Sequence, residues 1–201
     1  MEEGCTAGLS SVGIEYSVNV VQLLETKMID DMRKLQDVTI PEGVEVIRAH
    51  WFYKSHIKSV EIPSSVRKIE TEAFCECFYL ERVRFASGSN LTEIGSDSFS
   101  GTEIKSIVIP KSVMTIRDGA FGYCSSLRSV VFEKGSRLQV LEGGCFRTTK
   151  MEEITIPRTL REASKWTFYF CDNLRTIWVE RGCKVDFRKL VKDSVEVRYT
   201  Q

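Results

Sequence analysis

The segment EAFCECFYLERV, residues 72–83, contains two cysteines separated by one residue, Cys75 and Cys77. A Cys-x-Cys pair can supply half of a metal site or form a redox couple, because a thiolate is both a metal ligand and a nucleophile. The same two side chains can instead be compact hydrophobic residues of a core. The elements that position the pair decide between these alternatives.

An internal repeat organises most of the chain. Each of the four prolines follows an isoleucine, in the sequences TIPEGV, EIPSSV, VIPKSV and TIPRTL. Six phenylalanines follow one another at alternating steps of 22 and 25 residues: Phe52, Phe74, Phe99, Phe121, Phe146 and Phe168. Two kinds of unit therefore alternate with a combined period of about 47 residues, which is typical of a solenoid.

Each unit begins with the pattern L-x-x-I-x-I. Its alternation predicts a short strand, which is followed by a turn and by an apolar pair that ends in phenylalanine. We predict a solenoid of about six coils of roughly 23 residues over residues 38–180, with one parallel β-sheet.

The segments that flank the repeat are interpreted as caps. Residues 19–36 place apolar side chains at steps of three or four and predict an amphipathic helix. Because a solenoid must cover its apolar ends, we assign residues 1–37 to a helical N-terminal cap and residues 181–201 to a C-terminal cap that closes with a strand at VEVRY. A partner-binding helix is the alternative for the first segment. With this helix the predicted class is α/β.

The repeat supplies an explanation for the cysteines. Three residues after the phenylalanine of each unit, cysteine and threonine alternate: Cys77, Thr102, Cys124, Thr149 and Cys171. Coils stack roughly 4.8 Å apart, so successive cysteines lie about 10 Å from each other, whereas a disulfide needs Cα atoms within roughly 7 Å. We predict that these thiols are buried, reduced and inert.

The remaining cysteines give no stronger case for chemistry. Cys145 and Cys183 occupy positions that hold small residues in other units, while Cys5 and Cys75 have no equivalent in the repeat. A zinc site needs four convergent Cys or His ligands, and neither histidine of the chain lies in the repeat that contains the Cys-x-Cys pair. The sequence therefore predicts no metal site and no cofactor.

Charge and motifs exclude several classes of function. The 28 basic residues balance 28 acidic residues, so no net charge draws the chain to nucleic acid. No run of 18 apolar residues occurs and the N-terminus MEEGCTAGLSS lacks the features of a secretory signal, so we predict no direct membrane insertion and leave the location open. No phosphate-binding loop, HExxH or GxSxG motif occurs. We predict no catalytic residues and no enzyme, with an unrecognised site as a remote alternative.

The segment IKSIVIPKSVMTIRDGAFGYCSSLRSVVF is similar to the leucine-rich repeats of the BspA-like family, whose units run strand, Ile-Pro-x-Ser-Val, Ile, Ala-Phe, Cys and Leu. The match covers residues 38–180 and departs from the pattern where Ala163 replaces the expected isoleucine. The resemblance implies a leucine-rich repeat solenoid and a non-catalytic protein-protein interaction module, active in adhesion or in binding a host or partner protein at a cell surface. An intracellular leucine-rich repeat scaffold, in the cytoplasm, is the alternative.

The strand pattern also predicts where a partner binds. In each strand, alternation directs the residue between the two core positions outward, and these residues form one column along the stacked coils. The second half of the column contains Val108, Val131 and Trp178. Apolar residues at solvent positions are features of interfaces, although the same residue types also suit strands. Four basic residues flank the column: Arg84, Lys105, Arg128 and Arg175. We predict a protein partner on this outer face. Lys105 and Arg128 place like charges next to Val108 and Val131, so an acidic partner, if there is one, would contact the face there.

Overall fold

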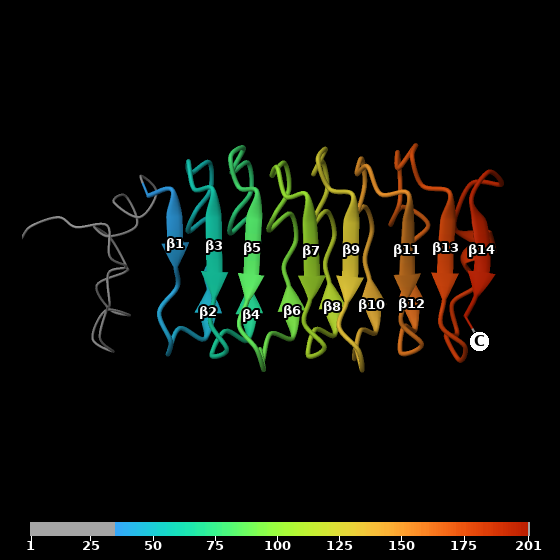
Figure 1. Cartoon of the computed structure of the whole chain (residues 1–201), viewed down its shortest axis with the longest axis horizontal. Coiled ribbons are helices and arrows are strands. Elements are labelled where there is room, and N and C mark those ends of the chain that lie inside the picture. Colours follow the sequence, from blue (N-terminus) through green and yellow to red (C-terminus); the bar gives the residue numbers. More distant parts are fainter. Residues whose placement is uncertain (1–34, 201) are drawn as a thin grey trace, which may run out of the picture.

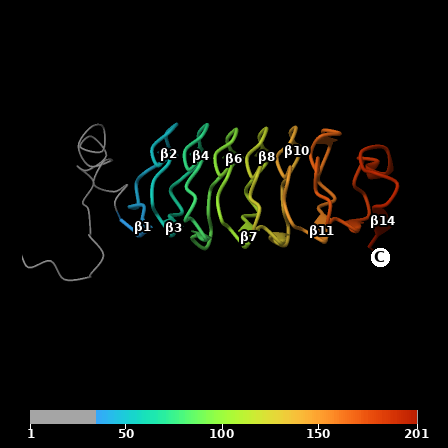
Figure 2. The ribbon, with the colours of Figure 1, turned by 90° about the horizontal axis from the view of Figure 1, so that it is seen from above.

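A computed structural model describes residues 35–200, which form a solenoid of stacked coils (Figure 1). Each coil carries a long strand and, on its opposite side, a short strand (Figure 2). The long strands are β1 (Asp37–Thr39), β3 (Ser59–Ile62), β5 (Arg82–Phe85), β7 (Ser106–Ile109), β9 (Ser129–Phe132), β11 (Glu153–Ile156), β13 (Thr176–Val179) and β14 (Glu196–Tyr199). The short strands are β2 (Val46–Ile47), β4 (Lys68–Ile69), β6 (Glu93–Ile94), β8 (Thr115–Ile116), β10 (Val140–Leu141) and β12 (Glu162–Ala163). Within the described residues six coils contain both strands, and β13 begins a seventh turn.

Both kinds of strand pair in parallel from coil to coil. The short strands form one continuous ladder in the order β12-β10-β8-β6-β4-β2. The long strands form three ladders, β1-β3-β5, β7-β9 and β11-β13-β14. The expectation of a single parallel sheet is therefore wrong, because the residues that precede each phenylalanine also pair, in strands of only two residues.

The long-strand ladder is interrupted between β5 and β7 and between β9 and β11, and Figure 1 shows wider intervals at both places. We call these interruptions the first seam and the second seam. The chain runs eight residues from Phe121 to Ser129 at the start of β9, but only seven from Phe146 to Glu153 at the start of β11. Phe52 also lies seven residues before Ser59, yet β3 pairs with β1, so this spacing by itself does not explain the seams.

The centre of the core is a stack of phenylalanine rings. From Phe52 to Phe168, successive ring centroids lie 4.9, 5.0, 5.3, 5.7 and 5.9 Å apart, and neighbouring rings are within 10° of parallel. The predicted alternation of the long strands is confirmed, since in β3 Val60 and Ile62 are buried and Glu61 is exposed. Burial of one such ring stabilises the fold by about 1.5–3 kcal/mol.

The coil of residues 154–177 is packed differently from the others, as the sequence indicates. Ala163 stands where the earlier short strands place a fully buried isoleucine or leucine, and it is only partly buried. Phe168 in the same coil is also only partly buried, and the side chain of Trp166 is 48% exposed. This end of the core is therefore more exposed to solvent than the preceding coils.

The described residues contain no α-helix. Their only helical turn is the 3₁₀-helix η1 (Phe187–Lys189), so this part of the chain is a β-solenoid and not the expected α/β solenoid. The helix predicted over residues 19–36 lies outside the described residues except for Leu35 and Gln36, which are not helical. No helix within residues 35–200 has the length and hydrophobicity needed to cross a membrane.

The C-terminal segment continues the solenoid past the last repeat. β14 lies within the alternating sequence VEVRY, where a strand is expected, and pairs in parallel with β13. Phe187 of η1 is fully buried, and its ring centroid lies 6.3 Å from that of Phe168. The division of the chain into caps and repeat at residues 37 and 180 stays a prediction.

Candidate binding surface

The predicted column of thiols and hydroxyls is present and buried. Free cysteines alternate along it with hydroxyl residues: Ser55, Cys77, Thr102, Cys124, Thr149 and Cys171. Each hydroxyl oxygen lies 3.2 Å from the sulfur of the following coil. Each sulfur also donates to the carbonyl oxygen of a phenylalanine one coil earlier, at 2.8 Å for Cys77 and Phe52. The column therefore satisfies polar atoms inside the core.

Burial keeps these thiols protonated. It raises the pKa of Cys124 to about 11 and, together with the nearby carboxylates of Glu72 and Glu76, that of Cys75 to about 12. At neutral pH the thiolate, which is both the nucleophile and the metal ligand, is scarcely populated. Residues 35–200 contain no group of three His, Cys, Asp or Glu side chains arranged to hold a metal ion. Cys75 and Cys77 are both buried, with 8% and 0% of their surface exposed, so the Cys-x-Cys pair packs inside the fold.

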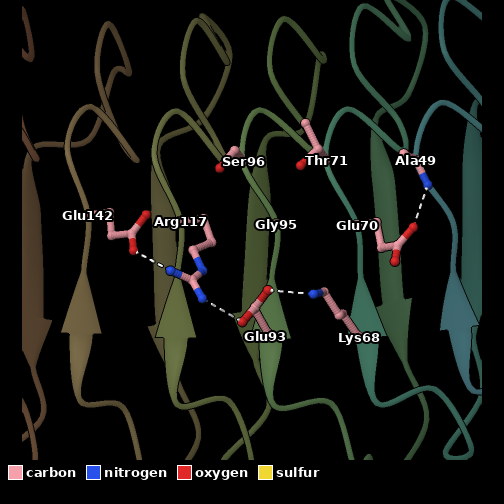
Figure 3. A pocket seen from close by; sticks show the side chains of 9 residues that line it. All are labelled: Ala49, Lys68, Glu70, Thr71, Glu93, Gly95, Ser96, Arg117 and Glu142. Carbon is pink, nitrogen blue, oxygen red and sulfur yellow. Dashed lines mark hydrogen bonds and ion pairs between the residues drawn. The ribbon is translucent and has the colours of Figure 1, made fainter.

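A hollow of about 300 Å³ lies over the short-strand ladder (Figure 3). A chain of ion pairs crosses it, because Glu93 lies 3.2 Å from Lys68 Nζ and 2.9 Å from Arg117. Arg117 in turn lies 2.7 Å from Glu142. Glu70 accepts a hydrogen bond from a backbone N–H of the preceding coil at 3.1 Å. Since each of these charged groups has a partner within the protein, the arrangement favours stability over ligand binding.

The outer face of the long strands carries an exposed apolar pair. Val108 in β7 and Val131 in β9 lie directly opposite each other in the ladder and are 52% and 51% exposed. The neighbours of Val108 in sequence, Ile107 and Ile109, are buried, so the two valines point away from the core. Two adjacent apolar side chains thus meet solvent at the centre of this face.

The basic residues predicted beside this face have different surroundings. Arg84 lies 3.7 Å from Glu61, and Lys105 lies 2.7 Å from Glu81. The carboxylate of Glu81 neutralises Lys105, so Lys105 and Arg128 are not a pair of uncompensated like charges. Glu81 and Lys105, which precede β5 and β7, thus form an ion pair between neighbouring coils.

Arg128 and Arg175 line the same hollow, which has a volume of about 340 Å³ and lies across β9, β11 and β13. Lys150, Glu152, Glu153 and Thr176 complete its lining. Within residues 35–200 no ion pair joins Arg128, Lys150 or Arg175 to a carboxylate. The structure therefore brings together two of the four predicted basic residues and adds a third, Lys150.

Trp178 points outward but is partly covered. Its indole N–H donates to Glu153 at 3.1 Å, and the guanidinium of Arg198 lies 5.2 Å from the ring centroid. Ile177 and Val179 on either side are fully buried, so the predicted alternation holds in β13. Trp178 is therefore bonded to Glu153 of the hollow and is not a freely exposed anchor.

The model of the BspA-type leucine-rich repeat region matches the chain in six copies, over residues 5–128 and 92–186. The chain belongs to the BspA-type leucine-rich repeat family. No curated protein matches it.

Solved structures with this fold resemble the chain over most of its length. The pneumococcal vaccine antigen PcpA superposes with a TM-score of 0.68 at 22% identity, over 76% of this chain and 42% of PcpA. A leucine-rich cell surface protein from Faecalibacterium prausnitzii gives a TM-score of 0.51 at 26% identity, over 73% of this chain and 48% of that protein. The leucine-rich repeat protein of T. pallidum gives a TM-score of 0.51 at 22% identity, over 83% of this chain and 70% of that protein. The chain thus spans less than half the length of the first two.

We call the hollow lined by Arg128, Lys150 and Arg175 the basic hollow. Of these three residues, only Lys150 is absent from the binding residues predicted from the sequence. In the BspA-type unit of the same kind two coils earlier, its equivalent is Glu103, whose carboxylate accepts a hydrogen bond from Ser126 at 2.5 Å. The reversal of charge between these equivalent positions is the signal in the sequence that points to Lys150.

A second exposed apolar group lies outside the predicted face. Trp166, Tyr169 and Phe170 are 48%, 44% and 55% exposed, and the rings of Trp166 and Tyr169 meet nearly at right angles with centroids 5.0 Å apart. Phe170 has a φ of 57°, which bulky residues rarely adopt. The same position has a positive φ throughout the BspA-type coils, as in Tyr123 and Thr148, so the repeat imposes this conformation. The backbone of Phe170 is therefore no sign of function by itself.

Proposed function

We propose that this chain is a non-catalytic protein-binding module that engages its partner through the outer face of β7 and β9. One observation carries the proposal: Val108 and Val131 lie side by side with 52% and 51% of their surface exposed. The corresponding positions in the other long strands hold polar residues, such as Glu61 and Thr155, or the partly covered Trp178. An apolar centre within a charged surround is the composition of a binding face.

The family supports a role in binding rather than in catalysis. Leucine-rich repeat proteins of the kind that this chain matches are generally protein-interaction modules. We propose further that the partner is a host or matrix protein and that binding serves adhesion at a cell surface. The name of the F. prausnitzii structure as a cell surface protein supports this extension. Labelling of intact and of permeabilised cells separates it from an intracellular scaffold, which would be reached only after permeabilisation.

A set of matched variants tests the binding face. We expect Val131→Ser and Val108→Ser each to weaken binding to a purified matrix protein about 30-fold, because an interface anchor contributes roughly 2 kcal/mol. The control is Glu61→Ser in the polar half of the same column, which should change the affinity less than about twofold. Surface plasmon resonance against a panel of matrix proteins measures all three, with melting temperatures recorded in parallel. Loss of binding in Glu61→Ser alone would place the interface at the other end of the sheet.

A further inference from the structure

The second seam opens a hollow whose cations have no partner within the described protein. Arg128 precedes β9, Lys150 precedes β11 and Arg175 precedes β13, so three successive coils supply one cation each. Two carboxylates share the lining, and one of them, Glu153, already accepts the indole N–H of Trp178. Three cations against two carboxylates leave the hollow with an excess of positive charge.

In the first seam, by contrast, the charges at the equivalent repeat positions are paired. There, Glu81 and Lys105 face each other across the interruption and form an ion pair at 2.7 Å. In the second seam the same two repeat positions hold Arg128 and Glu152, with the signs exchanged, and no ion pair joins them. The charges of one seam are satisfied internally, whereas those of the other face solvent.

In two other hollows on the described part of the molecule the cations are paired. The hollow over β1, β3 and β5 has a volume of about 410 Å³, and there Arg82 lies 3.7 Å from Asp37 and Arg84 lies 3.7 Å from Glu61. The hollow of Figure 3 contains the continuous ion-pair chain of Lys68, Glu93, Arg117 and Glu142. Unpaired cations thus distinguish the second seam from these two surfaces.

Along the strands from the second seam lies an exposed apolar side chain, in a hollow whose lining also contains Glu133, Lys134 and Glu180. Val131 is 51% exposed, and it lines, together with Thr155 and Pro157, a smaller hollow of about 120 Å³. Ser129, next to Arg128, and Val131 are two residues apart in the same strand, which corresponds to about 7 Å. In an extended peptide, side chains two residues apart point to the same side and are separated by the same distance.

We propose that the second seam binds an extended segment of a partner protein, with an aspartate or glutamate side chain in the basic hollow and an aliphatic side chain two residues away against Val131. This inference rests on the proposed function, and it adds the chemistry of the partner. Charge complementarity selects the acidic side chain, and extended chains laid along a sheet present alternate side chains to such pockets.

A peptide fits this surface better than a sulfated glycan does. The carboxylates of Glu152 and Glu153 repel a chain that carries a negative charge on every residue, but Glu152 can accept a hydrogen bond from a backbone N–H. Val131 offers an apolar contact that a peptide side chain uses and a sulfated sugar does not. The surface is therefore suited to a ligand with one negative charge beside an apolar group.

The test is a selection of displayed octapeptides on the full chain, followed by affinity measurements with synthetic peptides. We expect the selected sequences to contain an acidic residue two positions from Val, Leu or Ile. Replacement of that acid by its amide in the peptide, or Arg128→Gln or Lys150→Gln in the protein, should each weaken binding at least tenfold. Arg82→Gln, in the polar half of the same face, is the matched control and should change the affinity less than twofold.

The outcomes separate this inference from the proposed function. If Val131→Ser weakens the selected peptides while Arg128→Gln and Lys150→Gln do not, the face binds but the basic hollow is not the acidic subsite, and the inference is overturned alone. If none of these variants matters, both fall. If the selected peptides lack acids and a heparin hexasaccharide binds in an Arg128-dependent manner, the hollow is a glycan site and the inference is overturned in favour of that ligand.

Discussion

At the scale of single residues, burial and pairing determine which side chains can act. The thiols of the column are enclosed by hydroxyl and carbonyl oxygens of the neighbouring coils, at 3.2 Å from Thr102 for Cys124. Arg128 and Lys150 have the opposite environment, since they line a hollow and have no carboxylate partner within the described residues. The buried thiols are therefore shielded from reagents and ligands, whereas the cations of the hollow are available to a partner.

The first prediction concerns the thiols. With pKa values raised by burial, to about 11 for Cys124 and about 12 for Cys75, both residues should resist a thiol reagent at pH 7.5 in the native protein. Mass spectrometry of the labelled protein locates each modification, and labelling in denaturant gives the full count. Rapid native modification of Cys124 would show that the column is accessible. Reaction of Cys5, which lies outside the described residues, is compatible with the prediction.

The second prediction concerns Trp178. Its ring is partly covered by Arg198 and its N–H is bonded to Glu153, while Ile177 and Val179 form the core. We expect Trp178→Ser to remove one hydrogen bond and one cation–π contact, at a cost of about 1–2.5 kcal/mol in the free energy of unfolding. Urea denaturation measures this loss. Complete unfolding of the variant would mean that the indole belongs to the core.

At the scale of elements, two sets of side-chain contacts hold the coils together by different forces. The phenylalanine stack joins the coils through apolar contact, with ring centroids 4.9–5.9 Å apart. On the short-strand side, the ion pairs of Lys68, Glu93, Arg117 and Glu142 join four coils through charge. The stabilisation by the phenylalanine stack should not depend on pH, whereas the stabilisation by the ion pairs should.

The third prediction tests the phenylalanine stack. Phe121 is fully buried at its centre, so Phe121→Ala should lower the free energy of unfolding by about 3–5 kcal/mol. Phe168, which is only partly buried, should lose less on the same substitution. Urea denaturation followed by circular dichroism compares the two, with Val131→Ala as a surface control. A loss below about 1 kcal/mol for Phe121→Ala would show that the ring does not fill the core.

The fourth prediction concerns acid stability. Burial raises the pKa of Glu93, but hydrogen bonds from Arg117 and Lys68 outweigh it and leave the pKa below its usual value of 4.5. A lowered pKa in the folded state means that the ionised carboxylate stabilises the fold above pH 4.5 and that this contribution is lost as the pH falls through the folded pKa. We expect Glu93→Gln to have a lower melting temperature than the wild type at pH 7 and a smaller fall in melting temperature toward pH 3.

Asp97 supplies the control for the fourth prediction. Burial raises its pKa even though Arg147 lies 3.4 Å away, so the protonated form of Asp97 is favoured in the folded state. Its effect on stability has the opposite sign, because the contribution is present at low pH and lost as the pH rises. Asp97→Asn should therefore retain the acid-induced fall that Glu93→Gln loses. Equal pH profiles for the wild type and Glu93→Gln would contradict the assignment.

At the scale of the whole molecule, the repeat was predictable and its local interruptions were not. The steps between Phe52 and Phe168 predict both the coil and the ring stack, since one phenylalanine recurs in each coil. The short-strand ladder has strands of two residues, such as β4, which are too short to show an alternation of apolar residues. The seams depend on where strands enter the ladder, and no residue type marks that.

The same limit applies to the candidate site. The outward direction of Val108 and Val131 follows from the period of two along a strand, and both side chains are exposed in the structure. The ion pair of Lys105 with Glu81 is found only in the structure, as is the absence of an ion pair for Arg128 within residues 35–200. The sequence shows which opposite charges lie in neighbouring coils, but not which of them meet in the fold.

Binding through the outer face of β7 and β9 is tested most directly by methyl NMR of the full chain with the matrix protein that binds it most tightly. We predict that the methyl resonances of Val108 and Val131 shift or broaden on addition of the partner, because these side chains form the centre of the proposed interface. The buried isoleucines of the short-strand ladder, such as Ile69 and Ile94, should stay unchanged. Unchanged resonances for both valines, with changes confined to residues around Trp166 and Phe170, would contradict the proposal and place the interface on the aromatic group.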